Sequence, residues 1–468
     1  MAASYNENSV NILLISTYEL GRQPFGLASP AAWFRRRGHE VACLDLSRQA
    51  LDERAVRSAN LIAFYVPMHT AARLALQLVE PLRRLSPAAK LCAYGLYAPL
   101  TEQAFRKLGV GALFGGEFEE RLLHFAESFG KPAPSVNLWK FSPEETISLA
   151  RQKFETPDRA GLAPLRQYAH LVLPSGEHRT AGYTEASRGC KHLCRHCPIV
   201  PVYNGVFRIV DRDVVLADIR QQAASGAQHI TFGDPDFFNG IGHALPIVKA
   251  LHREFPALTY DATIKIEHLV LYEKHLPLLR DTGCLFVTSA VESLDDHVLS
   301  KLEKGHTRAD FFHVVRSFRS LGLTLQPTFI PFTPWTTLDS FRDLLDTLIE
   351  LDLVSAVSPI QLAIRLLIPA RSRLLELPEI QRVISPFDDA ALVYPWRHCD
   401  PGMDFLCEQL QDLVAAGEKQ KLSRAQTFER IWNTVHAMDA ANAPATLRQM
   451  PVLAARAAVP YLNEPWYC

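Results

Sequence analysis

The sequence predicts an α/β protein with three parts: a doubly wound N-terminal domain, a partial (β/α)6 barrel and a helical C-terminal cap. Short apolar runs alternate with helical stretches over roughly the first hundred residues, and the same rhythm resumes after residue 184. Such alternation indicates parallel sheets covered by helices. Past about residue 385 only helical patterns return, near 403–415 and 423–441. A chain of 468 residues has room for two or three domains.

The N-terminal domain is expected over residues 1–131. Each of its strands is a short apolar run that ends in a loop, which suits a buried parallel strand. The strands and helices are predicted at residues 11–16, 31–37, 40–45, 61–66, 70–85 and 90–94. This order indicates a Rossmann-like open sheet.

Residues 132–183 are rich in Pro, Ser and Arg with weak periodicity, which indicates a linker or strap. The barrel is expected over residues 184–384 and the cap over 385–468. The barrel strands are predicted at residues 184–187, 229–232, 258–264, 284–293, 325–331 and 360–369. Their carboxyl ends should meet on one face, where sheets of parallel strands usually carry their chemistry.

Three cysteines follow the first predicted barrel strand at the spacing Cys-x3-Cys-x2-Cys: Cys190, Cys194 and Cys197. Thiolates bind iron strongly, and three of them in a short loop can hold three corners of a 4Fe–4S cluster while one iron stays open. A structural zinc site is the main alternative, with His192 or His196 as the fourth ligand. A disulfide is disfavoured because the group is odd in number and no secretory signal precedes it.

This cysteine motif, with the half-barrel that follows, resembles the radical S-adenosylmethionine (radical SAM) superfamily. The resemblance covers roughly residues 184–369. It implies that the cofactors are a 4Fe–4S cluster and SAM, whose amino and carboxylate groups chelate the open iron. One electron from the cluster would then break a carbon–sulfur bond of the sulfonium, so the cysteines would be the catalytic residues as well as the metal ligands.

The same resemblance implies where SAM is held. The turn Gly233-Asp234-Pro235-Asp236 lies where the family binds the amino end of SAM, so Asp234 and Asp236 are candidates for the ammonium group. These residues are also ordinary turn formers, which is the alternative interpretation. Glu292, with Ser289 on the same strand, matches the place where the family binds the ribose hydroxyls.

Two cations at strand ends have several possible partners. Lys265 could meet the SAM carboxylate or pair with Glu267 or Glu292. Arg365 stands alone in an apolar strand, and burying an unpaired guanidinium is very costly. It should therefore have a carboxylate partner, which could be the SAM carboxylate, a substrate or Glu292.

The N-terminal domain resembles the cobalamin-binding domains found in many radical SAM enzymes. Those domains usually place a cobalt-ligating histidine just after the first strand. Here residues 17–26 contain no histidine. The sequence analysis therefore predicts the fold of that domain but no bound cobalamin.

The C-terminal cap contains Cys399, Cys407 and Cys468, whose spacing matches no common iron or zinc motif. Lone cysteines usually behave as small hydrophobes. The tail Glu464-Pro465-Trp466, together with the 233–238 turn, resembles a radical SAM subgroup with a Cys-Cys/Sec-Ala-Glu-Pro tail, although the paired cysteine is missing here. That subgroup includes the enzyme of arsinothricin biosynthesis that joins the 3-amino-3-carboxypropyl group of SAM to trivalent arsenic.

The first hypothesis is therefore aminocarboxypropyl transfer from SAM to arsenite, with release of methylthioadenosine; arsenite is soft and thiophilic, so one of the three cap cysteines could hold it. The cysteine motif alone equally predicts a 5′-deoxyadenosyl radical that abstracts hydrogen from a small metabolite or peptide. A third possibility is a protein that binds the cluster and SAM but catalyses nothing.

Composition restricts the partners. The formal net charge is −1 and no block of like charges stands out, so neither nucleic acid nor a membrane is an expected partner. The start has no secretory signal and no apolar run approaches the ~18 residues that a membrane span needs. Nine cysteines then fit a reducing cytoplasm, with flavodoxin or ferredoxin as electron donor to a small-molecule reaction.

Overall fold

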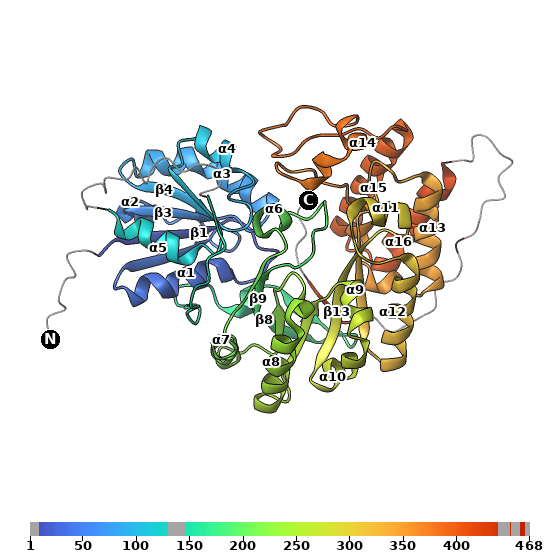
Figure 1. The fold of residues 1–468 in the computed structure, drawn as a ribbon, viewed down its shortest axis with the longest axis horizontal. Coiled ribbons are helices and arrows are strands. Elements are labelled where there is room, and N and C mark those ends of the chain that lie inside the picture. Colours follow the sequence, from blue (N-terminus) through green and yellow to red (C-terminus); the bar gives the residue numbers. More distant parts are fainter. Residues whose placement is uncertain (1–8, 130–145, 439–449, 451–458, 464–468) are drawn as a thin grey trace.

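The computed structural model describes residues 9–129, 146–438, 450 and 459–463. Figure 1 shows two α/β units beside each other, the N-terminal unit in blue and cyan and the barrel unit in green to orange. The predicted α/β fold, with its curled half-barrel, is confirmed.

The N-terminal sheet has the order β2-β1-β3-β4-β5-β6, and all its neighbouring strands are parallel. The strands are β1 Asn11–Ser16, β2 Glu40–Asp45, β3 Leu61–Tyr65, β4 Lys90–Tyr94, β5 Ala112–Gly116 and β6 Ile147–Ser148. β1, β3 and β5 are almost wholly buried, as expected for strands covered on both faces. The first four strands were predicted within a residue; β5 and β6 were not.

Helices cover both faces of this sheet. They are α1 Phe25–Arg36, α2 Glu53–Ser58, α3 His69–Leu85, α4 Glu102–Lys107 and α5 Glu119–Glu127. The two faces have separate apolar cores: α1 and α5 pack with one, and α2, α3 and α4 with the other. The first helix begins at Phe25 rather than at 31, because its first two turns are small or apolar and are buried.

The barrel sheet has the order β14-β13-β12-β11-β8-β7-β15. Its strands are β7 His170–Val172, β8 His178–Thr184, β11 His229–Phe232, β12 Thr259–Thr263, β13 Cys284–Glu292, β14 Thr324–Phe329 and β15 Tyr461–Leu462. β8 and β11–β14 are parallel, whereas β7 and β15 add antiparallel strands at one edge. β7 and β8 lie inside the predicted linker, so the sheet that contains the barrel strands begins before residue 184.

Helices line the outside of the barrel, and the chain's C-terminal helices join them. They are α7 Arg212–Ala224, α8 Ile241–Glu254, α9 Ile266–Leu271, α10 Leu276–Asp281, α11 Asp296–Leu302, α12 Arg308–Leu321, α13 Leu338–Glu350, α14 Pro378–Gln381, α15 Pro401–Lys419 and α16 Arg424–Ala437. The short helix α6 Val200–Tyr203 packs against the N-terminal domain instead. Local sequence sets their ends: α12 begins at a Thr307–Asp310 capping box and ends at Gly322, which has a positive φ.

Two differences from the prediction concern the end of the barrel. The sixth strand, expected at 360–369, is reduced to a short 3-10 turn over Pro359–Leu362 and a single bridge between Phe332 and Arg365. The predicted C-terminal helices are present as α15 and α16. Their apolar faces belong to the same core as the barrel strands, so they extend the barrel more than they cap it.

The two sheets direct the carboxyl ends of their strands toward a shared space. Residues that follow β1, β3, β4 and β5 line one side of a cavity, and residues that follow β8 and β11 line the other. This arrangement places the likeliest binding surface of an open α/β sheet against the start of the barrel. No helix within the described ranges is long and apolar enough to cross a membrane.

Arg159, in the segment between the domains, ties them together. Its guanidinium forms two bonds of 2.8 Å with the Asp218 carboxylate on α7 and donates to the Tyr183 carbonyl and to Gln23 of the N-terminal domain, each at 2.7 Å. The side chains are 9% and 1% exposed, so this pair is shielded from water.

Asp218→Asn should lower the free energy of unfolding by about 3–5 kcal/mol, because it leaves the buried Arg159 charge without its partner. Urea denaturation followed by circular dichroism measures the change. Glu254→Gln is the matched control: its pair with Arg220 is 35–50% exposed and should be worth less than about 1 kcal/mol. Equal losses in the two variants would contradict the role given to Arg159.

Candidate functional site

The three motif cysteines lie on one loop held at both ends by a short antiparallel ladder. β9 (Ser187–Gly189) enters the loop, β10 (Phe207–Ile209) leaves it, and the two strands pair with each other. Gly189 has a φ of 74°, and a Cβ there would lie 2.4 Å from the Tyr203 ring. The turn into the loop therefore requires glycine.

The cysteines face a shielded interior. Cys190 and Cys194 are buried and Cys197 is half-buried. Burial raises the pKa of Cys197 to about 12, and the neighbouring Cys194 and Cys190 thiolates raise it further, which places the three sulfurs within electrostatic reach of one another. A bound metal ion would hold a thiol such as that of Cys197 deprotonated at neutral pH. Three soft ligands on one loop fit a 4Fe–4S cluster.

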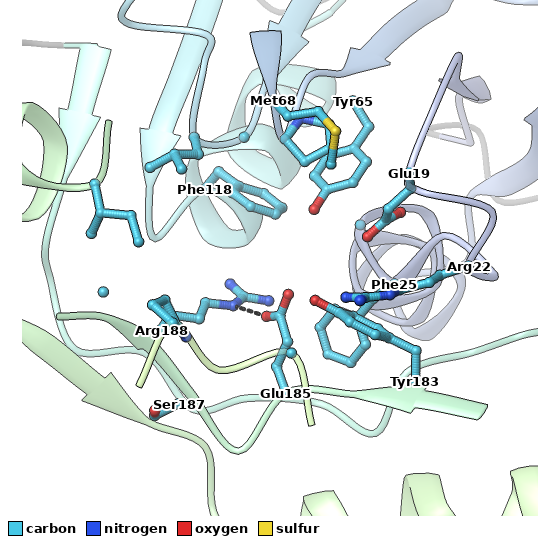
Figure 2. A pocket seen from close by; sticks show the side chains of 18 of the residues that line it. Glu19, Arg22, Phe25, Tyr65, Met68, Phe118, Tyr183, Glu185, Ser187 and Arg188 are labelled. Atoms are coloured by element: carbon cyan, nitrogen blue, oxygen red, sulfur yellow. Dashed lines mark hydrogen bonds and ion pairs between the residues drawn. The ribbon is translucent and has the colours of Figure 1, made fainter. Parts of the chain in front are cut away.

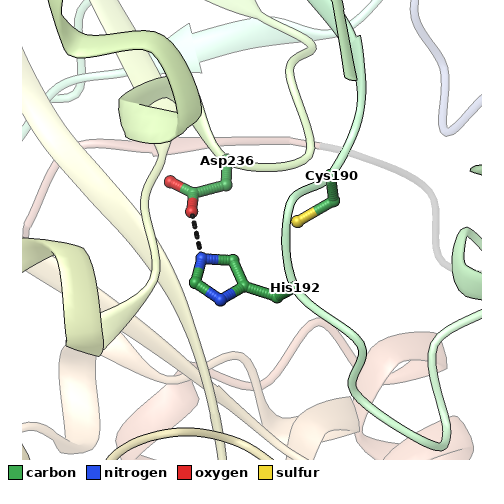
Figure 3. A group of neighbouring side chains, drawn as sticks. All are labelled: Cys190, His192 and Asp236. Atoms are coloured by element: carbon green, nitrogen blue, oxygen red, sulfur yellow. Dashed lines mark ion pairs between the residues drawn. The ribbon is translucent and has the colours of Figure 1, made fainter. Parts of the chain in front are cut away.

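Asp236, from the turn after β11, lies against this loop. Figure 3 shows Cys190, His192 and Asp236 facing one another, and their ligand atoms lie within 4.8 Å of each other. His192 also meets Glu267 at 3.3 Å, and His268 Nδ1 lies 2.6 Å from the Asp236 carboxylate. Burial alone would raise the pKa of Asp236, but His192 and His268 outweigh it and lower the pKa to about 2. Among the described residues, Cys190, His192 and Asp236 are the only group of His, Cys, Asp or Glu side chains whose ligand atoms lie close enough together to hold a metal ion such as zinc. Cys194 and Cys197 are not part of this group.

Gly233 and Asp234 begin the same turn, in a different environment. The Asp234 carboxylate accepts the Ala186 N–H at 3.0 Å and the Ser187 hydroxyl at 2.5 Å. Burial raises its pKa to about 7. A Cβ on Gly233 would lie 1.9 Å from the Tyr183 hydroxyl, so this position also requires glycine. Asp234 thus binds the backbone that leads into the cysteine loop; its contact with SAM stays a prediction.

Glu292 ends β13 as predicted and is linked to the cysteine loop. Its carboxylate lies 3.2 Å from Lys304 Nζ and 3.1 Å from Nε2 of His196, which stands between Cys194 and Cys197. Burial would raise the pKa of Glu292, but Lys304 and His196 lower it to about 2. Its φ is 68°, at a point where the β13–β14 register shifts. Ser289, on the same strand, is buried, and its hydroxyl has no hydrogen-bond partner among the described residues.

The two predicted cations have protein partners. Lys265 precedes α9 and donates to Glu267 at 3.1 Å. Arg365 binds Asp404 of α15 at 2.7 Å and the Trp396 carbonyl at 2.6 Å, and its guanidinium lies 3.6 Å from the centre of the Trp396 ring. Arg365 does have a carboxylate partner, but this partner is Asp404 and not Glu292, the protein residue that was expected.

The cap cysteines have different surroundings. Cys399 is exposed just before α15, whereas Cys407 lies within α15 and belongs to the barrel core, where burial raises its pKa. Cys468 and the Glu464-Pro465-Trp466 tail lie outside the described residues.

Sequence analysis missed the cavity between the domains, whose volume is about 270 Å³. Figure 2 shows the oxygens of Glu19, Tyr65, Tyr183 and Glu185 pointing toward its centre. Glu19 is 6% exposed, and one of its carboxylate oxygens has no hydrogen-bond partner among the described residues. Burial and the nearby Glu185 raise its pKa well above the usual value. The one sequence signal was the place of Glu19, in the loop where related domains carry histidine.

Comparison with known proteins agrees with this geometry. Residues 184–348 match the radical SAM superfamily. The chain carries a radical SAM domain. It is 25% identical over 258 residues to a ribosomal protein uS12 methylthiotransferase of Parabacteroides distasonis, covering 50% of this chain and 54% of that protein. It is 25% identical to the hopanoid C-3 methylase of Methylococcus capsulatus over 32% of this chain and 29% of the methylase. The radical SAM chain thus spans about half, or less, of the curated relatives it matches.

Solved structures resemble more of the chain. The radical SAM methyltransferase TsrM of Kitasatospora setae, with cobalamin and a 4Fe–4S cluster bound, has a TM-score of 0.57 at 18% identity, covering 74% of this chain and 73% of TsrM. The cobalamin-dependent radical SAM enzyme OxsB, with aqua-cobalamin bound, has a TM-score of 0.63 at 16% identity, covering 87% and 67%. At these identities the likeness establishes the fold.

These neighbours correct one prediction. The expectation that no cobalamin is bound is contradicted by the structures of TsrM and OxsB, which have this architecture and contain cobalamin. The physical reason is that a missing histidine removes one possible cobalt ligand, whereas the cofactor's place depends on the domain that surrounds it.

The pKa of Asp234 gives a pH test. The pKa of Asp234 is about 7 in the folded protein and near 3.8 in the unfolded chain. The protonated carboxyl group therefore stabilises the folded state fully below pH 3.8, and this stabilisation is lost as the pH rises through about 7. Asp234→Asn should remove that loss, on the order of 4 kcal/mol between pH 4 and 7. Chemical denaturation across this range measures it.

Glu254→Gln is the control for this experiment. Arg220, which does not titrate in this range, lowers the pKa of Glu254, so removing this carboxylate should leave the slope between pH 5 and 7 as it is in the parent protein. Parallel curves for the parent and Asp234→Asn would contradict the assignment.

Proposed function

We propose that the protein uses a 4Fe–4S cluster on Cys190, Cys194 and Cys197 to cleave SAM reductively and transfers a SAM-derived group to a small molecule. The observation that carries the proposal is the placement of the cysteine loop beside the buried carboxylates of Asp236 and Glu292, at the carboxyl ends of β11 and β13. A reducing partner such as flavodoxin or ferredoxin would supply the electrons.

SAM would bind across these strand ends. Asp236 offers a permanently charged carboxylate to the ammonium group, and Glu292 with Ser289 offers acceptors to the ribose. Lys265 is buried, and its Nζ pairs with Glu267, whose side chain is 39% exposed, so Lys265 is suited to bind the SAM carboxylate. Asp234 and Arg365 already serve protein groups, so they are weaker candidates.

Cobalamin would occupy the cavity between the domains. The chemistry of the lining fits it: Glu19, Tyr65 and Tyr183 present oxygens to an enclosed space, and the corrin carries amide groups that hydrogen-bond to such oxygens. The cavity also reaches Ser187, Arg188 and Gly189, next to the first cluster cysteine. A bound cobalamin would supply a cobalt that carries a methyl group or exchanges single electrons.

The finer proposal is aminocarboxypropyl transfer to arsenite. It is supported by the resemblance of the 233–238 turn and the tail to the arsinothricin subgroup, and by Cys399, an exposed thiol suited to soft trivalent arsenic. One electron would break the bond between sulfur and the methionine γ-carbon, leaving methylthioadenosine and a carbon radical. The radical, a second electron and a proton would convert arsenite into the trivalent arsenic–carbon product and water.

Methyl transfer is the second candidate, and the inter-domain cavity specifically favours it. TsrM, whose two domains have the same arrangement, is a methyltransferase with cobalamin bound. Here SAM would give up its methyl group and S-adenosylhomocysteine would accumulate. Hydrogen abstraction by a 5′-deoxyadenosyl radical would instead release 5′-deoxyadenosine.

The experiment is anaerobic reconstitution of the cluster, addition of SAM, dithionite and arsenite with and without hydroxocobalamin, and mass spectrometry of the adenosyl products. We expect arsenite-dependent methylthioadenosine and a new amino acid with a carbon–arsenic bond. Cys190→Ala should abolish both products together with the broad iron–sulfur absorbance near ~400 nm.

Each other outcome has a defined meaning. S-adenosylhomocysteine that requires cobalamin would replace arsenic chemistry with methyl transfer. 5′-Deoxyadenosine without any effect of arsenite would indicate hydrogen abstraction. Retention of the cluster with no SAM cleavage would contradict the enzymatic proposal. Cys407→Ala is a matched control, because this buried thiol should not affect the cluster.

A further inference from the structure

Arg188 lies two residues before the first cluster cysteine, and its side chain binds carboxylates of the N-terminal domain. Its guanidinium donates two bonds to the Glu119 carboxylate, at 2.7 and 2.9 Å, and one to Glu185 at 2.8 Å. Glu117 adds a carboxylate oxygen at 3.8 Å. Glu119 is the first residue of α5, where a carboxylate also meets the positive end of the helix dipole.

This contact is one of the most deeply buried ion pairs of the described structure. The Arg188 side chain is 8% exposed and that of Glu119 is fully buried. The rings of Phe25, Phe118 and Phe154 surround the guanidinium, with centroids 5.1–5.8 Å away. A fork of two parallel bonds between aromatic walls permits one orientation of the arginine, so it fixes direction as well as charge.

The same turn also holds the other end of the cysteine loop. The Tyr203 hydroxyl, six residues after Cys197, donates to Glu117 at 3.1 Å. Tyr203 and Val202 belong to the apolar core of the N-terminal domain. The Tyr203 ring in turn packs over Gly189. Residues 117–119 therefore contact the chain just before and just after the three cysteines.

We propose that residues 117–119 are positioning residues for the cluster: through Arg188 and Tyr203 the N-terminal domain fixes both ends of the cysteine loop and thereby the geometry in which the iron is held. The inference rests on the proposed cluster. It gives the N-terminal domain a function in holding the cysteine loop.

The test uses the full-length protein with a reconstituted cluster. Glu119→Gln keeps the shape of the side chain and removes the charge that Arg188 binds, and Tyr203→Phe removes one hydroxyl from the other end of the loop. The rate at which a chelator strips iron should rise about tenfold in Glu119→Gln and by a smaller factor in Tyr203→Phe, because a loop held less firmly opens more often. The EPR spectrum of the reduced cluster with SAM should change as well.

Asp218→Asn is the matched control. It removes a buried carboxylate from an arginine pair that does not hold the cysteine loop, so it should lower the melting temperature comparably while leaving the stripping rate within about twofold and the EPR spectrum unchanged. Wild-type stripping and spectra in Glu119→Gln, with a lowered melting temperature, would overturn the inference. A parent protein that assembles no iron–sulfur cluster would instead overturn the proposed function.

Discussion

Buried charge around the cysteine loop is the constraint on which the rest of the structure depends. An ionised group removed from water must find a partner, and here each partner comes from a distant part of the chain. Arg188 meets Glu119, Asp236 meets His268, and Glu292 meets Lys304. Because each pair joins a different element, the loop, the barrel strands and the N-terminal domain can reach full neutrality only when all are assembled. The buried charges thus favour the fully assembled fold over partly assembled ones.

The same constraint explains how the cavity between the domains differs from the cluster side. There, Glu19 and Glu185 face one another, and Arg188 binds Glu185 at 2.8 Å. Burial raises the pKa of both carboxyl groups. The nearby Glu185 adds to the rise at Glu19, whereas Arg188 limits the rise at Glu185. A protonated carboxyl group donates and accepts hydrogen bonds, so the cavity suits a neutral ligand rich in amides.

Much of this could be predicted from sequence, and the misses have a common cause. The cysteine spacing, the first four N-terminal strands and Glu292 were predictable because each depends on local pattern. The partner of Arg365, the strand β15 and the Arg188 contacts were not, because they join residues 39 to 293 positions apart. Residues 170–183 were predicted as a linker because the partly exposed strands β7 and β8 lack the apolar run of a buried strand. The cobalamin prediction failed because it rested on one missing cobalt ligand, whereas binding depends on the whole surface around the cofactor.

Glu292 has a left-handed backbone conformation, which glycine and asparagine adopt more readily than glutamate. Neither of these residues has a carboxylate that could reach Lys304 and His196. The position is therefore subject to two opposed demands, one from the backbone and one from the site. Replacing Glu292 by glycine or asparagine relieves the backbone strain but removes the negative charge. Replacing it by aspartate keeps the charge on a shorter side chain, which no longer reaches Lys304 and His196. Random mutagenesis should consequently find almost no acceptable replacement here, and a search for more stable variants would drift toward inactive ones at this residue before most others.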